Sequence, residues 1–330
     1  MKTLLVIIVL FSISFTQMNA QCCSPGNPAG GIGAEGILEK NTARISLIYK
    51  GGFSDTYFGG NIGGSKTLQP SPDFIPSIKN ANYNYVGLYS RFGLTSRLTI
   101  DNELGYFINK TQNYKEGLIP SQLKGYGFTD FGIQFKYRLF NRREWEITPG
   151  IGLRFSVGQK EQKDKDGSTL PFDLWPTTGA NAFTTSFLIY KGFPHYHLRF
   201  FLEGRVDFPQ TAKVYRVDYK NGNIYSLAFI SSYSFDSKWT GVILFRNEYR
   251  RQDIKFISPP QEIYSSGSNK IFIVPQIHFR PHKNWYLTLF TDIPVYQYYN
   301  GKQLGNRVAY GLNISRYLKF QSKEKSQSSL

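Results

Sequence analysis

The stretch Thr129-Asp-Phe-Gly-Ile-Gln-Phe-Lys-Tyr-Arg-Leu139 alternates strictly between two kinds of residue. Phe131, Ile133 and Phe135 stand at odd positions, whereas polar residues such as Asp130 and Lys136 stand at even ones. Successive side chains of a β-strand point to opposite faces of the sheet, so this strand has one apolar and one polar face. Such a strand suits a wall with hydrocarbon on one side and water on the other.

The same pattern recurs along the chain, and we expect twelve strands: 43–50, 83–92, 97–108, 128–140, 144–156, 181–190, 197–206, 224–235, 239–249, 270–280, 285–296 and 307–320. Short turns and long loops alternate between them, which with an even strand count is typical of bacterial outer-membrane barrels. The pattern therefore predicts an all-β fold, a transmembrane antiparallel up-and-down β-barrel of about twelve strands over 43–320. A soluble sandwich or lipocalin-like barrel is the alternative, because alternation alone does not say which face is outside.

The N-terminus predicts export. Met1-Lys2 precedes an apolar run from Leu4 to Phe15, and Asn19-Ala20 offers a cleavage site, as in a secretory signal peptide. The run is shorter than the roughly 20 residues of a membrane-spanning helix. We expect a signal peptide at 1–20, a Gly-rich periplasmic or plug segment at 21–42 and a polar tail at 321–330, with the barrel in the bacterial outer membrane.

Two cysteines, Cys22 and Cys23, are adjacent, so they cannot cross-link distant parts of the fold. Lipidation of Cys22 stays open, although Gln21 stands where a lipobox wants a small residue.

Composition narrows the partners. The chain has a formal net charge of +16 and 16% aromatic residues. Its mean hydropathy of −0.34 argues against a helical membrane protein. A basic balance suggests nucleic acid, but an exported chain does not meet it, so we expect no nucleic-acid partner. Outer-membrane lipid and lipopolysaccharide, the barrel-assembly machinery and a small-molecule solute of unknown identity are the expected partners.

Three tryptophans follow short turns: Trp145, Trp239 and Trp285. They share one expected depth and predict an aromatic girdle at the periplasmic interface, where an indole meets both lipid and water. The last strand resembles the C-terminal assembly signal of outer-membrane barrels through Tyr310, Leu312, Ile314, Leu318 and Phe320. Arg316 departs from that pattern, because a cation on the lipid face fits only near an interface.

Four segments resemble the outer-membrane barrels of the phenol-degradation MetA-pathway family, in the type found in Bacteroidetes. The matching stretches are Arg91–Leu98, Gly127–Ile133, Asp292–Tyr298 with Asn300-Gly301, and Cys22–Ala29. The resemblance covers most of 22–320 and implies a barrel with a transport role, but its motifs are turns and strand ends that say little about the substrate.

No motif predicts chemistry. The glycines at 31, 33 and 36 spell GxGxxG but follow a signal peptide rather than a strand, and Asp164 and Asp166 form only a fragment of a calcium loop. His197 and His278 are expected to face the lumen, and no serine stands in a nucleophile motif. We therefore expect no enzyme activity, catalytic group, cofactor or metal site.

The polar face is the candidate site. Its expected lumen-lining residues are Arg97, Asp101, Glu103, Asp130, Lys136, Arg138, Glu146, Arg154, Arg199, Glu203, Arg205, His278, Arg280 and Asp292, with Arg44, Lys50, Arg246, Glu248, Arg307 and Lys319 on the same face. These charges either pair with one another and fill the barrel or border a narrow polar path. We expect a passive channel for a small, hydrophobic or aromatic solute. The alternatives are a barrel that acts through its extracellular loops in binding or adhesion, and an outer-membrane hydrolase.

Overall fold

The computed structural model describes residues 36–59, 78–115, 121–214, 216–257, 259–263 and 266–320. The predicted signal peptide, the tail at 321–330 and residues 21–35 lie outside these ranges. Within them, no helix is long and apolar enough to cross a membrane.

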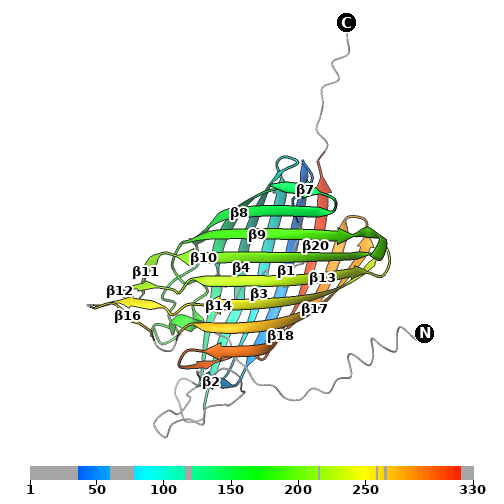
Figure 1. Cartoon of the computed structure of the whole chain (residues 1–330). Coiled ribbons are helices and arrows are strands. Elements are labelled where there is room, and N and C mark those ends of the chain that lie inside the picture. Colours follow the sequence, from blue (N-terminus) through cyan, green and yellow to red (C-terminus); the bar gives the residue numbers. More distant parts are fainter. Residues whose placement is uncertain are drawn as a thin grey trace, which may run out of the picture.

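Twelve antiparallel strands close into a barrel, as predicted (Figure 1). The barrel closes because β1 pairs with both β3 and β20, and β3 pairs with β4. β5 and β6 are separated only by Thr129 and both pair with β4, so they form one interrupted strand. The strands of the wall are β1 (Thr42–Ser54), β3 (Ile78–Gly93), β4 (Leu98–Tyr114), β5 (Gln122–Phe128) with β6 (Asp130–Tyr137), β8 (Trp145–Ser156), β9 (Ala182–Phe193), β10 (Leu198–Pro209), β13 (Ile224–Ser234), β14 (Trp239–Arg250), β17 (Ser268–His282), β18 (Trp285–Tyr299) and β20 (Val308–Lys319).

Several strands run further than the alternation indicates. β3 begins at Ile78 and β4 continues to Tyr114. Their added parts are mostly polar, and asparagine side chains link the two strands here: Asn113 donates to Asn80 at 2.6 Å, and Asn84, just inside the predicted range, donates to Asn109 at 3.2 Å. A strand that leaves the apolar band loses its alternation, so a pattern search stops short of its end.

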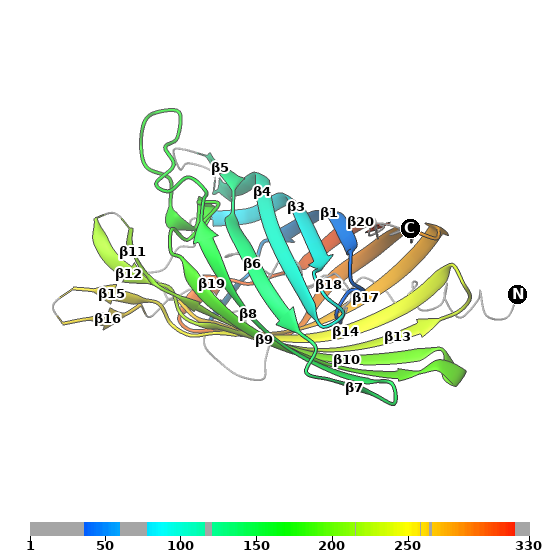
Figure 2. The same ribbon diagram turned by 90° about the horizontal axis from the view of Figure 1, so that it is seen from above.

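The two ends of the barrel differ in the length of their connections. Short turns join the strands at one end, the turn end, where β7 (Phe140–Arg142) and the short helix η3 (Pro194–Tyr196) also lie. At the other, the loop end, the loops form a sheet of β11 (Thr211–Val214), β12 (Val217–Lys220), β15 (Ile254–Phe256) and β16 (Gln261–Glu262) (Figure 2). A pair of β2 (Tyr57–Gly59) with β19 (Lys302–Leu304) lies at the same end. Thr42 pairs with Lys319 at the turn end, so the wall begins and ends there.

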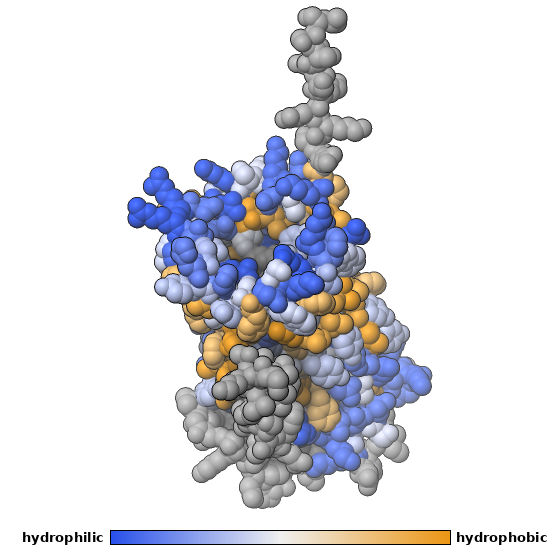
Figure 3. Space-filling model, turned by 90° about the vertical axis from the view of Figure 1, so that its right-hand side faces the viewer, coloured by the Kyte–Doolittle hydropathy of each residue, from blue (hydrophilic) through white to orange (hydrophobic). Residues whose placement is uncertain are grey.

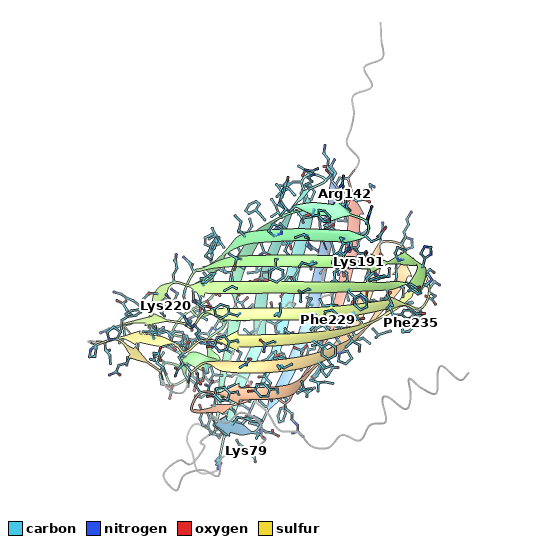
Figure 4. All side chains as sticks on the ribbon, viewed as in Figure 1. Lys79, Arg142, Lys191, Lys220, Phe229 and Phe235 are labelled. Atoms are coloured by element: carbon cyan, nitrogen blue, oxygen red, sulfur yellow. The ribbon has the colours of Figure 1, made fainter. Side chains whose placement is uncertain are left out.

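The apolar face of the wall points outward. On β1, Ile45 and Leu47 are 42% and 50% exposed, whereas their neighbours Ser46 and Ile48 are buried. Figure 3 shows an apolar band between hydrophilic regions on one face of the molecule. Phe229, labelled in Figure 4, lies midway along the wall, and Phe235 and Lys191 lie at the turn end. The apolar residues of the opening stretch therefore face outward, and its charges face the lumen.

Candidate functional site in the barrel lumen

One side of the lumen carries a chain of ion pairs. Asp101 on β4 contacts Arg91 at 2.9 Å and Lys136 at 3.0 Å. Arg138 contacts Glu146 at 2.8 Å across the next turn. The predicted charges of β4, β6 and β8 thus meet across neighbouring strands, and each carboxylate has a cation within hydrogen-bonding distance.

A second group crosses a wider stretch of wall. Glu103 on β4 contacts Arg154 at 3.0 Å and Arg205 at 3.4 Å, and Arg205 also contacts Asp207 at 3.1 Å. These strands are not all neighbours, so the long guanidinium groups reach over the lumen surface of the sheet. Asp130 is bonded instead to the hydroxyl of Thr177.

The opposite wall holds a buried triad. The Asp292 carboxylate accepts from Lys50 Nζ and from Arg246 Nη2, each at 2.8 Å. Beside it, Lys270 contacts Glu248 at 2.7 Å. All five side chains are at most 5% exposed. A buried charge without a partner is costly, so separating these pairs is unfavourable. The pairs therefore hold their strands in fixed positions relative to one another.

The remaining predicted lumen residues lie apart from these pairs. Glu203 lies on β10 beside Leu188 and Ala228, its register partners, while Arg199, His278 and Arg280 lie nearer the turn end. Arg97 differs from the prediction, because β4 begins at Leu98 and Arg97 sits in the exposed bend before it.

His197 also differs from the prediction. It adopts φ 55° in the turn after η3 and does not lie on a strand face. At both turns, the predicted strand begins one residue before the observed one, which starts at Leu98 and at Leu198.

An apolar layer crosses the middle of the lumen. Its buried members come from β1, β3, β9, β13, β14, β17 and β18, with Phe201 of β10 packed against them: Ile48, Tyr89, Leu188, Ala228, Ile230, Val242, Leu244, Phe272, Val274 and Phe290. β1 and β10 lie on opposite sides of the closed sheet, six strands apart. The layer therefore includes side chains from opposite sides of the barrel.

A cavity lies on each side of this layer. The loop-end chamber, of about 440 Å³, is bordered by aromatic side chains such as Tyr85, Trp175 and Tyr219 and by the paired charges Glu103, Arg154, Glu248 and Lys270. The turn-end chamber, of about 300 Å³, is bordered by Arg44, Arg199, Phe201, Asp236, Lys238, His278, Arg280 and Tyr286, among others. Among the described residues, the lumen thus contains these two cavities with the apolar layer between them.

The segment 36–41 lies against the lumenal wall at the turn end. Ile37 N donates to Glu146 Oε1 at 2.9 Å, and Leu38 N donates to Thr99 Oγ1 at 3.0 Å. Arg91 and Arg138 donate to the carbonyls of Gly36 and Ile37. Ile37 and Leu38 are buried, so this part of the predicted N-terminal plug segment occupies space inside the barrel.

Buried apolar residues around Trp175 form a cap at the loop end. In the sequence, Trp175 stands out as the fourth tryptophan, because it does not follow a short turn as the three girdle tryptophans do. Trp175 is 2% exposed and donates from Nε1 to Leu170 O at 2.9 Å. It packs with Leu174, which belongs to η2 (Phe172–Leu174), and with Leu123 and Val214. Residues 60–77, in the loop between β2 and β3 at the same end, lie outside the described ranges.

Tyr219 of the cap bonds to Asp253. Burial and the neighbouring Asp253 carboxylate raise the pKa of this phenol, so it stays protonated and donates.

The predicted girdle and assembly residues lie on the outer surface. Trp145, Trp239 and Trp285 are each the first residue of a strand at the turn end and are 39–43% exposed. Arg316 pairs with Trp285 in the ladder, and its guanidinium lies 5.2 Å from the ring centroid. The face of β20 with Tyr310, Leu312, Ile314 and Leu318 points outward, and Phe320 is 53% exposed just beyond it.

Comparison with known proteins places the fold. No family model and no curated protein matches the chain. The solved structure of the COG4313 outer membrane channel from Pseudomonas putida F1 is similar, with a TM-score of 0.65 at 11% identity, covering 89% of this chain and 99% of that one. The chain has the fold of an outer-membrane β-barrel.

Two further solved structures are more distant. The KdgM porin in complex with disordered oligogalacturonate matches with a TM-score of 0.42 at 12% identity, covering 83% of this chain and 98% of that one. A mutant of the TodX monoaromatic hydrocarbon channel matches with a TM-score of 0.42 at 8% identity, covering 86% and 91%. These scores are too low to carry an argument.

Proposed function

We propose that the chain is a passive outer-membrane channel for a small solute with an apolar or aromatic body. The observation that carries the proposal is the sequence of compartments along the bore: a chamber at each end and an apolar layer between them. A solute that passes must enter a polar chamber, cross apolar side chains and leave through a second polar chamber. An amphipathic molecule suits that order better than a hydrated ion, since apolar constrictions exclude water.

The balance of charge in the loop-end chamber supports the same proposal. Its cations, such as Arg154 and Lys270, lie against carboxylates, so they attract free ions weakly. Aromatic side chains border the same chamber, among them Phe107, Phe172 and Trp175. Aromatic faces bind flat apolar molecules through stacking and edge contacts.

The resemblance to the MetA-pathway barrels supports a transport role, and we propose membership of that family on the four quoted stretches. The COG4313 channel, which has a similar fold, is described as an outer membrane channel. We further propose that the turn end faces the periplasm, because short turns lie on that side in bacterial barrels, and that export depends on residues 1–20.

Planar-bilayer conductance of the purified full chain tests the channel. We expect discrete conductance steps that increase when residues 22–40 are deleted, because part of this segment occupies the lumen. Heat-dependent migration on gels verifies that each variant keeps its barrel. A folded protein without conductance before and after the deletion, and also when Phe272→Ala/Phe290→Ala opens the apolar layer, would exclude a channel and favour the barrel that acts through its loops.

A further inference from the structure

The turn-end chamber carries an excess of positive charge. Arg44, Arg199, Lys238 and Arg280 border it, and Asp236 is the single carboxylate among its described lining residues. The Asp236 carboxylate is already engaged: its Oδ1 accepts from the backbone N–H groups of Lys238 at 2.6 Å and Trp239 at 2.8 Å. Four cations thus border the chamber against one carboxylate, so its lining has an excess of positive charge.

This chamber contrasts with the rest of the lumen. Elsewhere many lumenal arginines and lysines contact carboxylates, as Arg154 contacts Glu103 and Lys50 contacts Asp292. In the described part of the chain, Arg199, Lys238 and Arg280 form no ion pair. Arg199 makes only a 3.3 Å hydrogen bond to the hydroxyl of Ser234. The guanidinium charges of Arg199 and Arg280 therefore have no carboxylate partner among the described residues and can act on a molecule in the chamber.

The floor of the chamber is apolar. Phe201, Ile230 and Val242 border the chamber and also belong to the apolar layer or pack against it. Arg44 is held at the rim of this floor, where its Nη2 donates to Ser315 Oγ at 3.1 Å and its guanidinium lies 5.5 Å from the Tyr317 ring. Cations at the wall and apolar side chains at the floor face the same cavity of about 300 Å³.

We propose that the turn-end chamber binds an amphipathic organic anion, with its carboxylate or sulfonate on Arg199 and Arg280 and its apolar body on Phe201 and Val242. Guanidinium groups pair with such planar or tetrahedral oxyanions through two parallel hydrogen bonds. The volume suits a ligand of about one aromatic ring, at the lower limit of ordinary ligand pockets. This proposal rests on the proposed channel function and gives it a substrate class.

Ligand-detected saturation-transfer NMR on the purified full chain in non-ionic detergent tests the site. The probe is benzenesulfonate, which stays ionised at every useful pH. We expect binding to the wild type and a roughly tenfold weaker affinity in the Arg199→Gln/Arg280→Gln variant, because two charge-assisted contacts are lost. The Arg199→Lys/Arg280→Lys variant should retain most of the affinity. Arg97→Gln, which removes a cation in the exposed bend outside the chamber, is the matched control.

Two further probes separate the parts of the proposal. Methanesulfonate carries the same head group without the ring, and phenyltrimethylammonium carries a ring on a cation. Weak binding of both supports an amphipathic anion site. Equal binding of the cation, equal binding of methanesulfonate, or an affinity for benzenesulfonate that Arg199→Gln/Arg280→Gln leaves unchanged would overturn it.

Conductance separates this inference from the channel itself. Under a potassium chloride gradient, we expect a reversal potential that indicates preference for chloride, and a smaller preference in the Arg199→Gln/Arg280→Gln variant. A folded protein that binds benzenesulfonate but never conducts would refute the channel and leave the site standing. A conducting protein without benzenesulfonate binding would refute the site alone.

Discussion

At the scale of single residues, the lumen is organised by carboxylates that each hold one or two cations. Asp292 is among the most buried of them: Lys50 and Arg246 both contact its Oδ2 at 2.8 Å, and all three side chains are at most 4% exposed. Removing one member of such a group leaves the others charged and desolvated, which costs more than the intact group contributes.

Asp292→Asn should therefore destabilise the barrel by about 3–5 kcal/mol, because Lys50 and Arg246 lose their shared counter-charge in a closed environment. Equilibrium urea unfolding in lipid vesicles, followed by tryptophan fluorescence, measures the change. Glu39→Gln is the matched control: it removes the exposed partner of Lys319, whose side chain is 73% exposed, and should leave unfolding unchanged. Equal unfolding midpoints for Asp292→Asn and the wild type would contradict the stabilising role.

The sequence could predict the face of these residues but not their partners. Period-two alternation places Glu103 and Arg205 on the polar side of their strands. Their 3.4 Å contact joins residues 102 positions apart on strands that are not neighbours, and it depends on how the barrel closes. Alternation carries no information on closure, so the choice between mutual pairing and an open polar path required the structure.

At the scale of elements, the segment 36–41 is held against the wall by hydrogen bonds of its own backbone groups. Gly93 allows the segment to lie this close to the wall, because a Cβ at that position would lie 2.1 Å from the carbonyl oxygen of Glu39. Asn41 N also donates to Gly93 O at 2.8 Å, so the two backbones run in direct contact. Only a residue without a side chain allows this approach.

Gly93→Ala should displace the segment and raise the single-channel conductance, because the added methyl group meets backbone that cannot rotate away. Planar-bilayer recording measures the effect, which we expect to be an increase of about twofold or more. Gly51→Ala is the matched control on β1, since the atoms nearest to its Cβ, from 3.0 Å, would belong to the Tyr310 side chain on the outer surface. An unchanged conductance in the folded Gly93→Ala protein would show that the segment does not limit flow.

Loops were the least predictable elements. The wall strands follow from alternation, but the cap around Trp175 is held by contacts such as the one between Lys110 Nζ and Trp175 O, at 2.9 Å, that no local pattern encodes. The same holds for the sheet of β11, β12, β15 and β16, whose strands have two to four residues and come from two separate loops. Strands this short show no measurable hydrophobic period.

At the scale of the whole molecule, the barrel combines a closed wall with a bore that is filled at its centre. A barrel of twelve strands has a wider interior than one of eight, which side chains fill, and a narrower interior than one of sixteen, which leaves an open channel. The apolar layer and the ion pairs occupy that room between two chambers. In the proposed channel, a solute can therefore pass only if the central side chains move aside.

The aromatic members of the layer should set the ion conductance. Phe290 lies against the backbone of β20, where a Cβ on Gly311 would meet its ring at 2.2 Å, and Phe272 lies under the Arg246 guanidinium at 4.6 Å. Replacing both rings opens space for water, and a wetted constriction admits ions that a dry one excludes.

Phe272→Ala/Phe290→Ala should therefore raise the potassium chloride conductance by roughly threefold or more, while passage of apolar solutes changes less, because the dry barrier acts chiefly on hydrated ions. Phe187→Ala/Phe229→Ala is the matched control: these rings are 40% and 44% exposed on the outer wall, and Figure 4 labels Phe229 there. It should match the wild type in conductance. Both double variants lose apolar contacts, so recordings are compared only for protein with heat-dependent migration on gels. Equal conductance in the two folded variants would place the barrier elsewhere, at the cap around Trp175 or at the segment 36–41, and the Gly93→Ala recording would then decide between those two.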